Sequence, residues 1–149
     1  MAGVVILQAK PSPCAPNAPH KFASLKSGEV NVRTGPGYQY PIQWTLVRKD
    51  LPVRILATFD NWQKIEDVEG KVGWVYKNLL NSNLKQMVIV TALKADVKKK
   101  PTDEALAIAY LEKGVIAALL ETQGSWCYLV VNKSVKGWVK SCDVWGVPQ

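Results

Sequence analysis

The chain has 149 residues, of which 48% are apolar, and a formal net charge of +7. Its length allows one ordinary domain or two small ones, and its apolar content is too high for a disordered protein. The positive charge is spread along the sequence and does not form the dense basic stripe that is typical of dedicated nucleic-acid-binding proteins. No apolar run in the sequence is long enough to cross a membrane as a helix.

Residues 1–21 are predicted to form an N-terminal segment that precedes the folded part of the chain. Residues 2–9 are apolar, like the core of a signal peptide, although no positively charged region precedes them in this sequence. We expect either the remnant of a longer export signal or an ordinary short strand or tail. The Pro-rich residues 11–19 predict a linker, because proline does not fit regular elements.

An internal repeat organises the rest of the sequence. Trp62 aligns with Trp126, 64 residues later, and at the same offset Gly73-Trp74-Val75 aligns with Gly137-Trp138-Val139. Upstream the offset is 65, which one deleted residue in a loop explains. A fixed period of this kind predicts repeated structural units. We therefore expect two domains, at residues 22–82 and 83–149.

Each copy is predicted to be a small all-β domain, because short strand patterns alternate with Gly/Pro turns and no long helical pattern is evident. The period-2 alternation that marks strands is clearest in the first copy. There the expected strands are residues 30–32, 42–47, 53–59, 63–66 and 72–76.

Residues 103–121 of the second copy are rich in Ala, Leu and Glu, and propensity alone predicts a helix there. The repeat argues against a helix, because this segment aligns without a gap to a β-branched stretch that contains Pro52. Gly114 falls where Asp50 is expected to make a turn in the first copy. We predict strands, since local propensity is weak against tertiary context.

The repeat resembles the bacterial SH3-like domain. In the first copy the matching residues are "EVNVRTGPG" (29–37), "TL" (45–46), "DNWQKI" (60–65) and "GKVGWVYKNLL" (70–80); in the second they are "ADVKKKP", "GSWCYL" and "VKGWVKS". The second copy is degenerate, since Lys99-Lys100 replace the Thr-Gly of the loop.

The resemblance implies two tandem, five-stranded, partly open SH3-like barrels, with a long loop at residues 34–44. It further implies an exported protein of the periplasm or cell envelope. Such modules recognise a cell-wall polymer (peptidoglycan or its peptide stems), a peptide or an envelope protein, often beside a catalytic domain. A polyproline ligand does not fit, because the loop carries no acidic residue and Leu79 replaces the late groove tyrosine.

No enzymatic activity, cofactor or metal site is expected. The single histidine, His20, lies in the linker, and a cysteine peptidase needs a Cys, a His and an orienting partner in one fold. A zinc site formed with Cys14, Cys127 and Cys142 is not expected either, because these residues lack metal-ligand spacing.

The aromatic residues supply the candidate ligand-binding face. Six Trp and five Tyr against two Phe favour rings with a polar atom, which suit half-buried positions and binding surfaces. Three of these rings lie in the Gly-Pro loop, where burial is harder to arrange, and Trp62 lies where SH3-like barrels carry a groove tryptophan. Trp74 and Trp138 are expected in the core or seam of each barrel. The predicted ligand-binding residues are Arg33, Tyr38, Tyr40, Trp44, Trp62 and Tyr76.

Two other interpretations stay open at this point. The protein is a structural adaptor if the two barrels pack on each other and bury the aromatic loop between them. Weak, salt-dependent binding of nucleic acid through Lys98–Lys100 is the less favoured reading, because such a short run of lysines is usually a solvated loop.

A disulfide between Cys127 and Cys142 is a further prediction. A hairpin that turns at residues 132–134 would set Cys127 opposite Lys140, with Cys142 two residues further along. That separation is at the edge of the reach of a disulfide. The alternative is a pair of buried free thiols.

Overall fold

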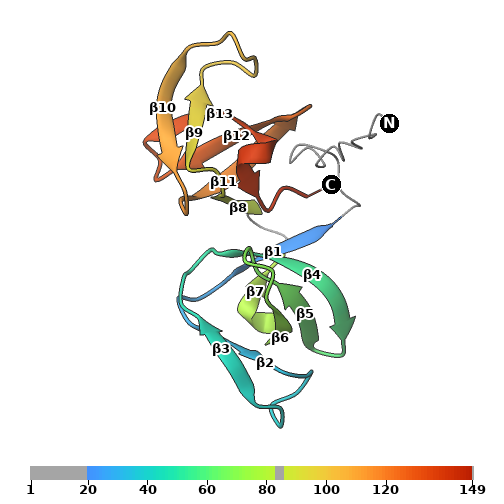
Figure 1. The fold of residues 1–149 in the computed structure, drawn as a ribbon. Helices are drawn as coiled ribbons and strands as arrows, with labels where there is room; N and C mark the ends of the chain where they lie inside the picture. The colour runs from blue at the N-terminus through green and yellow to red at the C-terminus, as the bar shows by residue number, and fades with distance from the viewer. Residues whose placement is uncertain (1–19, 83–85, 149) are drawn as a thin grey trace, which may run out of the picture.

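The computed structural model describes residues 20–82 and 86–148, so the predicted segment 1–21 lies almost wholly outside the described residues. The described chain is all-β, as predicted, and forms two seven-stranded antiparallel sheets (Figure 1). We name them the N-terminal domain and the C-terminal domain. The N-terminal domain contains β1 (Lys21–Leu25), β2 (Val30–Arg33), β3 (Ile42–Leu46), β4 (Pro52–Phe59), β5 (Trp62–Glu66), β6 (Val72–Tyr76), the 3₁₀ turn η1 (Lys77–Leu79) and β7 (Leu80–Asn81). The C-terminal domain contains β8 (Gln86–Val90), β9 (Lys94–Lys98), β10 (Ala107–Glu112), β11 (Ile116–Gln123), β12 (Trp126–Val131), β13 (Val135–Lys140), the 3₁₀ turn η2 (Ser141–Asp143) and β14 (Val144–Trp145).

The two domains have the same topology. The strand order is β3-β2-β6-β5-β4-β1-β7 in the first sheet and β10-β9-β13-β12-β11-β8-β14 in the second. The five strands predicted for the first copy are present as β2 to β6. The prediction of two tandem SH3-like domains is therefore confirmed, whereas the short strands β1 and β7 went unrecognised in the sequence.

The helix-prone residues of the second copy form strands β10 and β11, as the repeat predicted. Gly114, in the turn between these strands, has a φ of 91°, and Asp50, in the corresponding turn of the N-terminal domain, has a φ of 66°. In β11, Ala117 points into the core, while Ile116 and Ala118 are only half-buried. This period of two is imposed by pairing with β8 and β12, which outweighs helical propensity.

A glycine in each Gly-Trp-Val motif lets two strands approach closely. A Cβ atom on Gly73 would lie 2.4 Å from Cγ1 of Val32 and 3.2 Å from the ring of Trp44. The equivalent atom on Gly137 would lie 2.5 Å from Cγ1 of Val97. Because no larger residue fits, this motif fixes how β2 packs on β6 and how β9 packs on β13.

The tryptophan of each motif does not belong to the core, which corrects one part of the prediction that it lies in the core or seam of its barrel. Val75 and Val139 are fully buried, and side chains alternate between the two faces of a strand. Trp74 and Trp138 therefore lie on the outer face, where both are half-buried. The error arose because ring size favours burial, whereas strand alternation decides the direction of the side chain.

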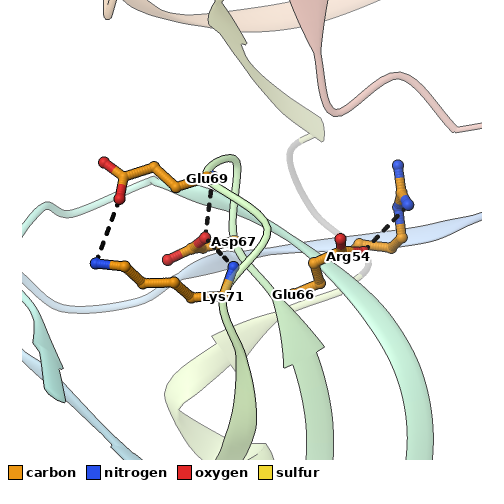
Figure 2. A network of polar contacts seen from close by, with 5 residues as sticks. All are labelled: Arg54, Glu66, Asp67, Glu69 and Lys71. Atoms are coloured by element: carbon orange, nitrogen blue, oxygen red, sulfur yellow. Dashed lines mark hydrogen bonds and ion pairs between the residues drawn. The ribbon is translucent and has the colours of Figure 1, made fainter. Parts of the chain in front are cut away.

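A tight turn fixes the register of the β5–β6 hairpin, which carries Trp62 and Tyr76. Asp67 is 5% exposed, and its Oδ1 accepts hydrogen bonds from the backbone N–H groups of Glu69 and Lys71, both at 2.9 Å (Figure 2). This Asx-type turn joins β5 to β6. With this register, Trp62 lies directly opposite Tyr76.

The domains meet at β1 and β8 (Figure 1), and Trp145 of the C-terminal strand β14 also reaches the N-terminal domain. The rings of Phe22 and Trp145 stack edge to face, with centroids 5.1 Å apart. The guanidinium of Arg54 lies 5.7 Å from both ring centroids and pairs with Glu66 at 3.1 Å (Figure 2). Strand β14 thus covers part of the outer face of the N-terminal domain.

Candidate functional site

Three aromatic rings of the N-terminal domain form one cluster. The centroid of the Tyr38 ring lies 5.0 Å from that of Trp62 and 5.8 Å from that of Tyr76, and the Trp62 and Tyr76 rings are 5.5 Å apart. Tyr38 is 66% exposed, whereas Trp62 is 8% exposed. We call these three residues the aromatic cluster; its floor is buried and its outermost ring faces solvent.

Two parts of the fold bring the aromatic cluster together. Trp62 and Tyr76 come from neighbouring strands, β5 and β6, in which they form a directly opposed pair. Tyr38 reaches them from the loop between β2 and β3. All three residues were predicted as ligand-binding residues, and the structure places their rings in contact.

Arg33 holds the loop that carries Tyr38. Its Nη1 donates hydrogen bonds to the backbone carbonyl oxygens of Tyr38, at 3.1 Å, and of Tyr40, at 2.9 Å. Its guanidinium also lies 5.2 Å from the centroid of the Tyr38 ring, in a cation–π contact. Arg33 is therefore a positioning residue, and its charge is engaged by the protein's own loop.

The other two predicted ligand-binding rings lie elsewhere. Tyr40 is 39% exposed, and its ring packs over Gly35, where a Cβ atom would lie 2.6 Å from Cδ1 of Tyr40. Trp44 is half-buried against the hydrophobic core, since it is paired with the inward-facing Val32. Within the described residues its indole N–H is buried without a hydrogen-bond partner. The structure therefore separates Trp44 from the aromatic cluster.

The aromatic loop is not buried between the domains. Tyr38 and Tyr40 both keep exposed rings, whereas the interdomain contact uses Phe22 and Trp145. The adaptor interpretation required burial of the loop, and that requirement is not met.

The C-terminal domain has a counterpart of the aromatic cluster with different chemistry. Trp126 lies opposite Lys140, as Trp62 lies opposite Tyr76. Nζ of Lys140 lies 2.8 Å from Oδ1 of Asp103 and 5.9 Å from the centroid of the Trp126 ring. An ion pair thus replaces the two tyrosines. These two residues were not predicted from the sequence, although the repeat offsets of 64 for Tyr76 and 65 for Tyr38 lead to Lys140 and Asp103.

Lys98 plays the role of Arg33 in the C-terminal domain. Its Nζ donates to the backbone carbonyl oxygens of Asp103, at 3.3 Å, and of Ala105, at 3.2 Å. These acceptors lie five and seven residues along the chain, the same spacing as for Arg33 in the N-terminal domain. One lysine of the Lys98–Lys100 run is therefore committed to holding a loop.

The ion pair sets the titration of nearby carboxyl groups. The hydrogen bond from Lys140 and its positive charge lower the pKa of Asp103, and the same contacts raise the pKa of Lys140. Burial raises the pKa of the neighbouring Asp143. The counterpart site therefore holds charged groups where the aromatic cluster holds neutral rings.

The predicted disulfide between Cys127 and Cys142 is wrong. Cys127 is a free thiol that is 1% exposed. Strands β12 and β13 pair one residue away from the expected register, so Cys127 lies opposite Val139 and points into the core. Cys142 lies beyond the end of β13, in η2.

In residues 20–82 and 86–148, His, Cys, Asp and Glu side chains do not gather in groups of three or more that could hold a metal ion. The same part of the chain has no helix that is long and apolar enough to span a membrane.

Comparison with curated proteins finds a relative with a cell-wall activity in its name. YrvJ of Bacillus subtilis (strain 168), which carries the name of an N-acetylmuramoyl-L-alanine amidase, is 27% identical over 128 residues. The match covers 80% of this chain and 24% of that protein. The chain thus spans about a quarter of the length of this relative.

Comparison with solved structures finds two from Trichomonas vaginalis, described as NlpC1 and NlpC2, with TM-scores of 0.40 and 0.39. They are 12% and 13% identical; the matches cover 96% and 84% of this chain, and 50% and 47% of those chains. An NlpC/P60 family protein from Bacillus cereus ATCC 10987 has a TM-score of 0.38 at 13% identity, over 83% of this chain and 55% of that one.

The profile of the family described as "Bacterial SH3 domain" matches residues 26–82 and 94–146. Each range covers most of one sheet, without its first strand (β1 or β8), and together they make up more than half of the chain. The protein therefore belongs to the bacterial SH3 domain family and carries two tandem copies of that domain.

Proposed function

We propose that the chain is a non-enzymatic binding module of the bacterial cell envelope, which recognises peptidoglycan, its peptide stems or an envelope peptide through the aromatic cluster. One observation carries this proposal. The ring of Tyr38 is 66% exposed, yet it is held against Trp62 and Tyr76 by contacts of its own domain.

The Tyr38 ring is suited to binding because it is already held in place, so that little conformational entropy is lost when a ligand binds. Arg33 already restrains the loop through two hydrogen bonds. Preorganised aromatic side chains offer a large contact area and little loss of rotamer freedom on binding. Such a ring stacks on the flat faces of peptide groups or sugar rings, while the phenol group of Tyr38 supplies a hydrogen bond.

The comparisons support the envelope as the place of action. The family is a bacterial one, and the curated relative is named for an activity on N-acetylmuramoyl-L-alanine, a component of the cell wall. Since this chain matches only 24% of that relative, we assign it binding and not hydrolysis. It needs no cofactor for this role, and it would act outside the cytoplasm.

Cosedimentation with purified sacculi tests the proposal. Tyr38→Ala should lower retention about tenfold or more, because aromatic residues at the centre of an interface contribute a large share of affinity. Tyr110→Ala is the matched control: Tyr110 is 56% exposed and lies in the C-terminal domain, near Lys94. Its removal should leave retention within twofold of the unchanged protein.

Thermal melting of both variants must match that of the unchanged protein for the comparison to count. We avoid Trp62→Ala, because Trp62 is a buried floor residue and its loss would disturb the fold. Equal retention of folded Tyr38→Ala and Tyr110→Ala would refute a role of the aromatic cluster in binding.

A further inference from the structure

A row across the outer face of the C-terminal sheet combines one lysine with three apolar residues, of which Met87 is buried while Ala118 and Val130 are half-buried. Lys136, Val130, Ala118 and Met87 lie directly opposite one another across β13, β12, β11 and β8. Their neighbours along the strands, such as Leu129, point into the core. An outer face of a small domain is normally polar, so apolar residues here indicate a surface that something covers.

This row lies in a groove between the two domains. The turn at Arg48–Asp50 of the N-terminal domain forms one wall, and β11, β12 and the hairpin turn at Asn132–Lys133 form the other. The groove has a volume of about 880 Å³. Leu120, which also lines it, is 64% exposed. We call it the interdomain groove.

The same row in the N-terminal domain is covered at one end, at Phe22 and Arg54, whereas Val72 at the other end is exposed. There Val72, Glu66, Arg54 and Phe22 lie opposite one another across β6, β5, β4 and β1. Trp145 of the C-terminal domain packs on Phe22 and Arg54. This covered row contains an ion pair, whereas the open row of the C-terminal domain has Ala118 and Val130 at the corresponding places.

The rim of the interdomain groove is positively charged. Arg48, Lys49, Lys133 and Lys136 line it, against the single carboxylate of Asp50. Among the described residues, none of the four cationic groups forms an ion pair with a carboxylate. Their charges are therefore available to a partner, and they favour a negative one.

We propose that the interdomain groove binds an acidic peptide segment of a partner protein. Apolar side chains of the segment would cover Ala118 and Val130, and its carboxylates would face Lys133 and Lys136. A phosphodiester polymer would match the rim but leave the apolar floor exposed to water, so the two features together favour a peptide. This site is separate from the aromatic cluster, which lies at the β2–β3 loop.

Fluorescence anisotropy with a defined peptide pool tests the proposal on the full chain. The probe is a pool of fluorescein-labelled decapeptides in which Asp or Glu alternates with Leu, Val or Trp. The double variant Lys133→Glu/Lys136→Glu should weaken binding tenfold or more, because it reverses two rim charges. The matched control Lys99→Glu/Lys100→Glu makes the same charge change at exposed lysines outside the groove, and it should weaken binding less than twofold.

A charge-neutral variant tests the floor separately. Val130→Gln should weaken binding of the pool at least threefold while the net charge stays the same, because it places an amide where an apolar side chain would pack. Equal affinity of the two lysine variants would overturn the proposal, as would equal binding of a pool with Lys in place of Asp and Glu. The proposal would also be overturned if the peptide pool did not bind while inorganic polyphosphate bound through Lys133 and Lys136. That result would indicate a phosphate polymer as the ligand.

Discussion

Nζ of Lys140 lies 2.8 Å from Oδ1 of Asp103, and these two residues occupy in the C-terminal domain the places of Tyr76 and Tyr38 in the N-terminal domain. The same scaffold therefore presents neutral rings in one copy and a charged pair in the other. A buried tryptophan lies beneath both. A ligand that stacks on the first site would meet strongly hydrated groups at the second, so we expect the two copies to differ in what they bind.

Asp103 should titrate at a lower pH than Asp143. Lys140 lowers the pKa of Asp103, whereas burial raises that of Asp143. A carboxyl group whose pKa is depressed on folding stabilises the fold above its unfolded-state pKa, and this contribution is lost as the pH falls through its folded-state pKa. Carboxyl ¹³C NMR titration measures both values directly. Lys140→Met should raise the pKa of Asp103; an unchanged value would mean that the ion pair does not persist in solution.

Gly73→Ala should lower the free energy of unfolding by about 1–3 kcal/mol, the usual cost of overpacking. The new Cβ would lie 2.4 Å from Val32 and 3.1 Å from the backbone oxygen of Arg33. Gly28→Ala is the control, because nothing lies within 4 Å of its added Cβ, and its effect should be within 0.5 kcal/mol, as for an ordinary surface change. Chemical denaturation gives both numbers. Similar losses for the two variants would contradict the close approach of β2 and β6.

Trp145→Ala should loosen the N-terminal domain, although Trp145 belongs to the C-terminal domain. The variant loses the ring contact with Phe22 and the cation–π contact with Arg54, together worth about 1–2 kcal/mol. Hydrogen exchange of the β1 amides should accelerate. Trp138→Ala removes an equally large ring that contacts Tyr128 within its own domain, so β1 should keep its protection. Unchanged exchange in Trp145→Ala would mean that the domains are not coupled through this contact.

Cys127 should resist alkylation in the folded protein and react readily once the protein is unfolded. Burial raises the pKa of its thiol to about 11, and the thiolate is the reactive form. Iodoacetamide at pH 8, followed by peptide mass spectrometry without prior reduction, should label Cys127 only after denaturant is added. Labelling in the native state would show that the core of the C-terminal domain opens, and failure to label after unfolding would show that Cys127 is bonded.

Much of the fold could be predicted from the sequence because the signals are local and repeated. Alternation of apolar and polar residues located β2 to β6, and the repeat placed strands where Ala, Leu and Glu favour a helix. The members of the aromatic cluster were also predicted, since Tyr38 lies in a Gly-Pro loop and Trp62 at a position typical of the family. The strands β1 and β7 were not recognised; β7 has only two residues, and both strands are stabilised by pairing with strands distant in the sequence.

The errors came from quantities that local sequence does not contain. The predicted cross-strand partner of Cys127 was Lys140, whereas the observed partner is Val139, so the predicted register was wrong by one residue. A shift of one residue in the register changes which side chains face the core. Trp44 was assigned to the ligand face because it follows a Gly-Pro loop in which burial is hard to arrange, but its pairing with Val32 turns it inward.

The sequence by itself determined the two copies and most of their strands, because each depends on residues that are near in the chain or that repeat at a fixed offset. It also named the rings of the aromatic cluster among six candidates, but only the tertiary structure showed which three of them lie together. Tertiary structure alone decided that Arg33 restrains Tyr38, that Trp145 covers the N-terminal domain, and that the C-terminal domain leaves the same face open. These features bring together side chains from several strands and from both domains. Their positions depend on strand register and on how the domains pack, and neither is encoded in a local pattern.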